Sequence, residues 1–503
     1  MDGGVVTRRD IVEGLGRIGI RPGDRVLVHA AIASFGHVDG GVEAVIDALR
    51  DAVGPSGTRL FPTFACSDPV FDPATSETAL GVLPSAAWKR PGAVRSRHPL
   101  ASVAAIGPDA EDLVRGHEEA ELAHGEGTPY VRLAERGGKI VLLGVDQDRS
   151  TFLHAMEELA RAAYLKPASG SYRTASGSVE ERTWPYFPGP HRNFIGLQSW
   201  IESQGLTSKT LIGSALCQAM PARGLMDAVS ARMAREPGLF LSGNPNLPDG
   251  VQQNADILRA ALARERFSTA ADSAFAGRAM EECIDNSLRF GIGTVLLSVV
   301  NGTPWERVAE HRRRWYLDGL ELAGLAVAAL RLVRADPAEA VRLAREARTA
   351  RVVVPSTWPT ARIAETARAL DASGARLCVE NLGVGGADMV RMIDSLQMDG
   401  ARVEAAFNPL AFVLAGENPF LASYSRTHIK ARIGLLYLND GLATGERTPL
   451  EEGLAEVKEM LSILRCRGFS GAVALQAPHP AGFPAAAGKL HSMLEELGSW
   501  PAV

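Results

Sequence analysis

The sequence predicts an α/β protein of two domains, with a mixed α/β first half and a second half of the (β/α)8-barrel type. Two observations carry this prediction. At 503 residues the chain is longer than one hydrophobic core normally supports. In the second half, strand-like apolar runs alternate with helical patterns over about 240 residues, the size of one such barrel. A doubly wound sheet would produce a similar series, so this alternative stays open from periodicity alone.

The elements of the first half are predicted from apolar periodicity and from the glycine and proline residues that bound it. One strand follows the turn at Pro22-Gly23, and the helix after it stops at Gly54-Pro55. Segment 166–192 is polar and aromatic, which is typical of a hairpin or a long loop. The predicted strands are Arg25–His29, Thr58–Phe64 and Lys139–Val145, and the predicted helices are Gly41–Val53 and Thr151–Tyr164.

A segment rich in proline and asparagine, 244–249, marks the expected domain boundary. We predict a first domain over 1–250, a helical linker over 251–265 and a second domain over 266–503. The predicted strands of the second domain are Arg266–Ala271, Thr294–Val299, Ala326–Leu332, Arg351–Val354, Arg376–Val379, Arg402–Phe407, Ile433–Leu438 and Ala472–Leu475. Helical patterns between them include Glu306–Ala323, Ala338–Ala347 and Leu450–Arg465.

Composition excludes several classes of function. The net charge of −5 argues against a nucleic-acid-binding protein, which needs a dense basic surface. The five cysteines are widely spread without metal-ligand spacing, so we expect reduced thiols in a cytoplasmic protein. The N-terminus lacks an apolar signal segment, and no apolar run is long enough to span a membrane. We therefore expect neither nucleic-acid nor membrane partners, with a homodimer as the default assembly.

Residues 29–41 form a small-residue and glycine turn between the first predicted strand and a helix. Free backbone N–H groups and a helix N-terminus suit a pyrophosphate group. A plain strand–turn–helix connection gives the same pattern and is the commoner interpretation of glycines alone. The candidate cofactor-binding residues of this turn are Ser34, Phe35, Gly36, His37, Val38, Gly40 and Gly41.

A second polar and basic turn, 91–103, carries Arg95 and Arg97, which are able to face phosphates or simply to be solvated.

A third segment places His154 in the first turn of a helix after the strand that ends in LLGV. Ser150 or Thr151 is the predicted N-cap. The positive end of the helix would lower the pKa of His154, and a neutral imidazole is what a general base requires. An ordinary helix histidine beside a surface carboxylate, Glu157, is the alternative.

Taken together, these segments resemble the aminoglycoside 3-N-acetyltransferase family over about residues 5–250. The order of several motifs is more specific than any one of them. The motifs are H-A-x-x-x-S-F-G-x-V-x-G-G at 29–41, P-T-F at 62–64, F-D-P at 71–73, R-S-x-H-P-x-x-S-V at 95–103, G-x-x-T-P-Y at 125–130, L-L-G-V at 142–145 and T-x-L-H-x-x-E at 151–157.

The resemblance implies an α/β/α layered domain and acetyl-CoA as the acyl donor, bound by the turn Ser34–Gly41. It also implies that His154 is the base, with Glu157 as the nearby carboxylate. The family pattern G-H-D is replaced by Asp146-Gln147-Asp148, and serines by Ala30-Ala31, which leaves the amine acceptor open. The further cofactor candidates are Ser96, Arg97, His98, Ser102 and Thr128, and the candidates for holding a cationic amine are Asp68, Asp72 and Asp148.

In the second half, LCVEN at 377–381 and NPLAFVLAGENP at 408–419 resemble the sugar phosphate isomerase/epimerase family, the xylose-isomerase-like barrels. That family holds a divalent metal with Glu, Asp, His and Glu at strand ends. Here Glu380 keeps the first ligand, whereas Asn408, Tyr437 and Gln476 stand in the other places. Amides and a phenol do not neutralise a hard cation, so we expect no metal.

The sequence therefore predicts an acetyl-CoA-dependent N-acetyltransferase, of the type that confers aminoglycoside resistance in bacteria, with a catalytically degenerate barrel attached. Its acceptor would be an amine of an aminoglycoside or of a related small molecule. Two alternatives stay open: a metal-dependent sugar isomerase or epimerase carried by the barrel, and a sugar-binding protein without enzymatic activity.

Overall fold

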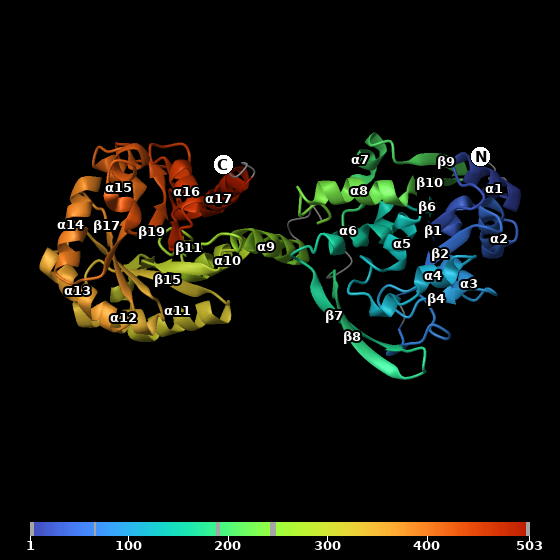
Figure 1. Ribbon diagram of the computed structural model, residues 1–503, viewed down its shortest axis with the longest axis horizontal. Coiled ribbons are helices and arrows are strands. Elements are labelled where there is room, and N and C mark those ends of the chain that lie inside the picture. Colours follow the sequence, from blue (N-terminus) through green and yellow to red (C-terminus); the bar gives the residue numbers. More distant parts are fainter. Residues whose placement is uncertain (1–4, 65–66, 188–191, 242–247, 499–503) are drawn as a thin grey trace. The chain divides into compact units, whose positions relative to one another are not determined.

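The structure is a computed structural model of the chain, and it describes residues 5–64, 67–187, 192–241 and 248–498. The chain divides into two compact units, Met1–Gln253 and Asn254–Val503, which run from blue to green and from yellow-green to red in Figure 1. Most of the predicted boundary segment, 244–249, lies outside the described residues. Helix α9 (Pro248–Leu262) follows it.

The first unit is built on a seven-stranded mixed sheet. Its centre is parallel, with Leu27 of β1 (Arg25–Ala30) opposite Leu60 of β2 (Thr58–Pro62) and opposite Ile140 of β6 (Lys139–Leu143). The outer strands pair antiparallel. They are β4 (Val94–Arg95), β5 (Val103–Ile106), β10 (Ala215–Pro221) and β9 (Ser208–Ile212), and the full order is β4-β5-β2-β1-β6-β10-β9.

Helices cover both faces of this sheet, which confirms the expected α/β/α layering. Because side chains alternate along a strand, Val26 and Val28 share one core cluster with the first helix layer, whereas Leu27 faces the opposite layer. The first layer holds α1 (Arg8–Arg17), α2 (Gly41–Val53) and α3 (Val82–Ala87). The second layer holds α4 (Ala110–Val114), α5 (Pro129–Glu135), α6 (His154–Leu159) and α8 (Ala222–Met233), and α7 (Gln198–Ser203) precedes β9.

The segment predicted as a hairpin or a loop is a hairpin, β7 (Lys166–Arg173) and β8 (Val179–Tyr186), which pairs with the short β3 (Val70–Phe71). The predicted helix Thr151–Tyr164 is wrong in length. A 3-10 turn, Thr151–Leu153, leads into α6, which ends at Leu159. Arg161 adopts a left-handed conformation with φ 46°, and the amide of Ala162 bonds to the carbonyl of Glu157, so a Schellman-type closure stops the helix.

The second unit is a closed barrel of eight parallel strands, which decides between the two predicted arrangements. Alternate side chains of the strands fill the barrel interior, for example Val353, Cys378 and Leu435. The strands are β11 (Ser268–Asp272), β12 (Thr294–Leu297), β15 (Ala326–Arg331), β16 (Arg351–Pro355), β17 (Arg376–Glu380), β18 (Val403–Phe407), β19 (Ile433–Leu438) and β22 (Ala472–Leu475).

Helices and short hairpins complete this unit. The predicted helix Leu450–Arg465 begins later than expected, because Glu451 and Glu456 have positive φ and the carboxylate of Asp440 accepts the amides of residues 451, 453 and 455. The helices are α10 (Met280–Arg289), α11 (Glu310–Leu322), α12 (Pro337–Glu346), α13 (Thr360–Ala372), α14 (Gly386–Met398), α15 (Pro409–Leu414), α16 (Val457–Cys466) and α17 (Phe483–Gly498). The hairpins pair β13 (Val299–Val300) with β14 (Thr303–Pro304) and β20 (Asp440–Gly441) with β21 (Arg447–Thr448).

Candidate active site

His154 begins α6 and lies beside a buried ion pair. Its Nδ1 atom is 3.3 Å from Oε2 of Glu157, whose side chain is fully buried. The other carboxylate oxygen of Glu157 accepts a hydrogen bond from Nε of Arg192, which is also buried. One turn of helix therefore points a carboxylate at the imidazole, and a guanidinium neutralises that carboxylate from behind.

Aromatic rings fix the plane of the His154 imidazole. Phe187, the residue after β8, stacks on it with ring centroids 3.6 Å apart and an interplanar angle of 3°. Phe194 contacts its edge at 4.9 Å. Since 13% of the His154 side chain remains exposed, the ring is held firmly and still reaches the surface.

The pKa of His154 is lowered, as predicted, but the cause differs from the prediction. Burial of the imidazole is the main cause, and His124 and Arg192 lower the pKa further, whereas the hydrogen bond that His154 donates to Glu157 raises it. The predicted cap plays no part, because the Ser150 side chain makes no capping hydrogen bond. The pKa of Glu157 is also lowered, because contacts with His154 and Arg192 together outweigh the effect of burial.

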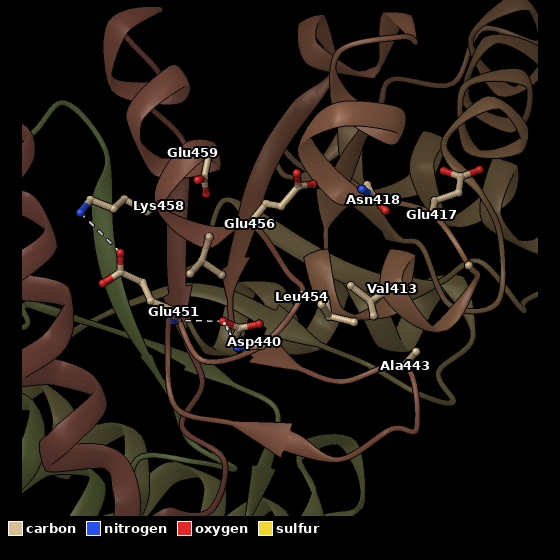
Figure 2. A pocket seen from close by; sticks show the side chains of 13 residues that line it. Val413, Glu417, Asn418, Asp440, Ala443, Glu451, Leu454, Glu456, Lys458 and Glu459 are labelled. Atoms are coloured by element: carbon tan, nitrogen blue, oxygen red, sulfur yellow. Dashed lines mark hydrogen bonds and ion pairs between the residues drawn. The ribbon is translucent and has the colours of Figure 1, made fainter.

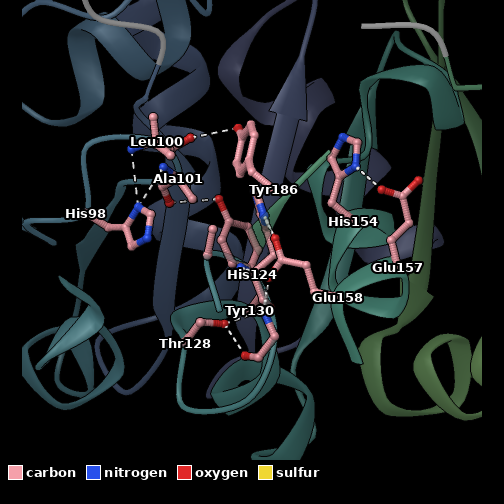
Figure 3. Close-up of polar contacts among 12 residues, drawn as sticks. His98, Leu100, Ala101, His124, Thr128, Tyr130, His154, Glu157, Glu158 and Tyr186 are labelled. Carbon is pink, nitrogen blue, oxygen red and sulfur yellow. Dashed lines mark hydrogen bonds and ion pairs between the residues drawn. The ribbon is translucent and has the colours of Figure 1, made fainter. Parts of the chain in front are cut away.

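A second histidine–carboxylate pair lies next to the first. Nδ1 of His124 is 2.8 Å from Oε1 of Glu158, and both side chains are fully buried. Oε2 of Glu158 also accepts the amides of His124 and Gly125, at 2.6 and 3.0 Å. The rings of His124 and His154 are 5.5 Å apart. Figure 3 shows that Glu157 and Glu158, which are adjacent in the sequence, pair with different histidines.

The turn predicted to bind the cofactor follows β1. Ser34 and Phe35 lie in a 3-10 turn, Phe35 and Val38 are core residues, and Ser34 donates to the carbonyl of Gly144 at 2.9 Å. Gly36 and Gly40 have φ of 87° and 75°. His37, Gly40 and Gly41 are exposed. Among the described residues, the amides of His37 and Gly40 have no hydrogen-bond acceptor, and no side chain caps the N-terminus of α2. The exposed part of the turn thus presents free N–H groups.

Four of the other cofactor candidates are buried and bonded to protein groups. Ser96 accepts the amide of Val103 and contacts Nδ1 of His117, both at 2.9 Å. Nδ1 of His98 accepts the amides of Leu100 and Ala101 at 3.2 Å. Ser102 lies 3.3 Å from Thr63, and Thr128 donates to the carbonyls of residues 124 and 125. These bonds hold segments 96–103 and 124–128 in place, and contact with a cofactor stays a prediction for all four.

The remaining candidates are partly or fully exposed. Arg97 contacts the carbonyl of Arg173 at 3.3 Å. Asp72 is paired with the Arg173 guanidinium at 2.9 Å. Asp148 accepts the amide of Ile195 at 2.6 Å, and Asp68 is exposed. The role of the three aspartates in holding an amine stays a prediction.

Sequence reasoning missed His124, Glu158, Arg192 and Phe187. Arg192 lies 35 residues beyond Glu157, so no local pattern connects them. His124 immediately precedes the quoted motif at 125–130, and Glu158 immediately follows the quoted motif at 151–157. The spacing of these motifs did not indicate that the two residues meet.

At the carboxyl ends of the barrel strands, Glu380 lies in a hydrogen-bonded network. Its Oε2 atom accepts Nε of Arg331 at 2.7 Å, and its Oε1 atom accepts the amide of Asn408 at 2.9 Å. Arg331 ends β15 and Glu380 ends β17. A guanidinium thus supplies the positive charge beside this carboxylate.

The same network runs on to the opposite side of the barrel. Asn439 donates to Asn408 at 3.0 Å and to Gln476 at 2.9 Å, and Gln476 donates to Asp272 at 2.7 Å. The buried hydroxyl of Tyr437 has no partner among the described residues. No group of three or more His, Cys, Asp or Glu side chains that could hold a metal exists in the described part of the chain. Neutral amides and an already paired carboxylate do not fit a divalent cation.

A separate pocket of the barrel unit, of about 500 Å³, is lined by several acidic residues (Figure 2). Their carboxylates hold the surrounding loops. Asp440 accepts backbone amides, Glu417 and Glu456 do the same, and Glu451 pairs with Lys458. These acidic side chains therefore have a structural role in holding the loops.

Within the described residues, no helix combines the length and the apolar character needed to cross a membrane.

The first half of the chain is similar to known proteins. The family model "Aminoglycoside 3-N-acetyltransferase" matches residues 27–234. Aminoglycoside N(3)-acetyltransferase VIII of Streptomyces fradiae is 40% identical over 195 residues, covering 33% of this chain and 68% of the relative. Aminoglycoside N(3)-acetyltransferase IV of Salmonella sp is 30% identical over 240 residues, covering 46% of this chain and 90% of the relative. A solved structure described as "AAC-IIIb binary with CoASH" is 29% identical, with a TM-score of 0.44 and coverage of 46% and 98%. The chain therefore belongs to the aminoglycoside 3-N-acetyltransferase family and is an acetyltransferase.

Proposed function

We propose that this chain transfers the acetyl group of acetyl-CoA to an amine of an aminoglycoside or a related amino-containing small molecule, with His154 as the general base. The observation that carries the proposal is the His154–Glu157–Arg192 arrangement in a member of an acetyltransferase family. The printed names of the relatives support the class of acceptor.

The roles of the side chains follow from their hydrogen bonds. Glu157 accepts the Nδ1–H of His154, so the lone pair of the neutral ring is on Nε2. Acetyl-CoA supplies the thioester carbonyl. As the bond from the amine nitrogen to that carbon forms and the C–S bond breaks, Nε2 accepts the amine proton and passes it to the departing thiolate. Glu157 stabilises the imidazolium, and Arg192 keeps Glu157 ionised.

The turn after β1 is proposed to hold the donor. Its exposed N–H groups at His37 and Gly40, together with the uncapped N-terminus of the 13-residue helix α2, suit the pyrophosphate of acetyl-CoA. Ser34, Gly36, Gly41 and Arg97 belong to the same proposed donor site. Phe35, Val38, Ser96, His98, Ser102 and Thr128 would act through backbone groups or by holding the two segments, since their side chains are buried or already bonded. Asp68, Asp72 and Asp148 are proposed to attract the cationic acceptor.

Replacing the base tests the proposal. His154→Ala should lower turnover by about 10²–10⁴-fold, the usual contribution of a positioned base, with little change in acetyl-CoA affinity. Release of free CoA thiol with a panel of amines measures turnover, and calorimetry measures affinity. His311→Ala, at an exposed histidine of the barrel unit, is the matched control. Near-wild-type turnover of folded His154→Ala would exclude His154 as the base.

A further inference from the structure

The paired histidines carry an electrostatic arrangement that goes beyond the base itself. Four buried or nearly buried ionisable groups, Glu157, Glu158, His124 and His154, lie together with Arg192. Burying a charge without a counterion is costly, so each carboxylate of this cluster needs one positive partner. Arg192 supplies one of the two positive charges that Glu157 and Glu158 need, so a histidine must supply the other.

The contacts distinguish the two histidines. Glu157 already has a cation, since it accepts a hydrogen bond from the Arg192 guanidinium. Glu158 has no Lys or Arg within ion-pair distance among the described residues, and its one ionisable partner is His124. A proton on His124 therefore neutralises Glu158, whereas a second proton on His154 would leave the cluster with excess positive charge.

The surroundings of His124 suit a cation. The rings of Tyr130, Tyr186 and Phe187 lie 4.9, 5.8 and 5.8 Å from it, and Phe64 lies 6.5 Å away. Aromatic faces attract positive charge. Its buried Nε2 atom has no hydrogen-bond partner among the described residues, so the ion pair with Glu158 must outweigh the cost of leaving that N–H without an acceptor.

The other ionisable groups that face the cluster stay neutral. Burial raises the pKa values of Tyr130, Tyr164 and Tyr186. Burial also lowers the pKa of His117 to about 3, and that of His98 well below its ordinary value. The four residues Glu157, Glu158, Arg192 and His124 therefore account for the local charge that His154 experiences.

We propose that His124 and Glu158 form a resident buried ion pair that keeps His154 as the neutral, proton-accepting histidine of the site. His124 is then a positioning residue that acts on His154 through charge, across the 5.5 Å between the rings. The proposal rests on the proposed function only for the catalytic role of His154, and the charge states stand apart from it.

The full-length wild-type chain tests the charge states directly. Nitrogen NMR of labelled imidazoles at neutral pH should show both ring nitrogens of His124 protonated and His154 with one protonated nitrogen. A neutral pattern at His124 would overturn the proposal. This measurement needs neither substrate nor turnover, so it is independent of whether His154 is the base.

Variants test the coupling. His124→Asn removes the positive charge while its amide can still donate to Glu158. The His154 titration midpoint, and the acid limb of kcat/KM, should then rise by about one to two pH units. The double variant His124→Asn/Glu158→Gln removes both charges and should return both midpoints toward the wild-type values. His117→Asn, which replaces a neutral buried imidazole, should leave them unmoved. An unshifted His154 midpoint in folded His124→Asn, or a double variant no closer to wild type than the single, would overturn the proposal.

Discussion

The candidate active site of the first unit and the mouth of the barrel contain similar charged side chains, but different groups surround them. Both bury carboxylates beside a guanidinium, Glu157 with Arg192 in one and Glu380 with Arg331 in the other. In the first unit the carboxylates also face imidazoles. In the barrel they face the amides of Asn408 and Gln476 and the hydroxyl of Ser298.

The two networks differ in the side chains that can exchange a proton near neutral pH. An imidazole exchanges a proton near neutral pH, whereas a guanidinium stays charged and an amide stays neutral. The described barrel network therefore has no imidazole, whereas the first unit places two imidazoles beside its carboxylates, one of which is proposed to be the base.

Removing the guanidinium from each unit should separate the two networks. Arg192→Met leaves Glu157 to be neutralised by a proton on His154, so turnover near neutral pH should fall by about 10²-fold. Loss of one partner of a buried pair also costs about 3–5 kcal/mol of unfolding free energy. Arg331→Met should destabilise the barrel and leave acetyl transfer unchanged. Turnover and denaturant unfolding measure both variants; equal losses of activity would break the comparison.

Acid should destabilise the first unit before the barrel. Burial lowers the pKa values of His29 and His117 to about 3, so the unfolded chain binds protons at these sites below about pH 6.5 and the folded chain does not. Stability therefore falls as pH falls, by about 1 kcal/mol for each such histidine between pH 7 and pH 5.5. Among the histidines in the described part of the barrel unit, His491 alone has a lowered pKa. Hydrogen exchange at the two pH values should show earlier exposure in the first unit; the reverse order would contradict this.

A side chain added to the turn after β1 should weaken the binding of acetyl-CoA. Gly36→Ala adds a Cβ with no neighbour closer than Ser214 Oγ at 3.7 Å, so the new atom enters the space proposed for the donor. The KM for acetyl-CoA should rise roughly tenfold, which corresponds to about 1.4 kcal/mol. Gly19→Ala has nearly the same φ, 86° against 87°, and no close neighbour, so it controls for backbone strain. Equal KM values in the two variants would exclude the turn.

Changes at the mouth of the barrel should have the smallest effects on activity and stability. Elemental analysis should find no stoichiometric divalent metal, and a chelator should leave acetyl transfer unchanged, because Glu380 is already paired with Arg331. Tyr437→Phe removes a hydroxyl that has no partner among the described residues, so unfolding free energy should change by less than about 1 kcal/mol. Zinc, manganese or cobalt that leaves together with activity on chelation would show that the barrel is a working metal site.

Periodicity predicted most of the architecture, because the spacing of buried residues in a strand or a helix involves only residues close together in the sequence. The helix Gly41–Val53 has the predicted bounds, and all eight predicted barrel strands overlap observed ones. The failures have local causes that periodicity does not contain. The helix after Thr151 stops at a left-handed residue, Arg161, and the helix predicted from Leu450 starts late because Asp440 gathers the amides before it.

The sequence by itself determined the family, the two α/β units and the His154–Glu157 pair, because motif order and helical spacing depend on residues close together in the chain. Only the tertiary structure decided which charges surround that pair. Arg192 reaches Glu157 across 35 residues of sequence, and His124 reaches Glu158 across 34. The pKa of a buried group depends on every charge within a few ångströms. No local pattern records those neighbours, so the electrostatics of the site emerge only when the chain is folded.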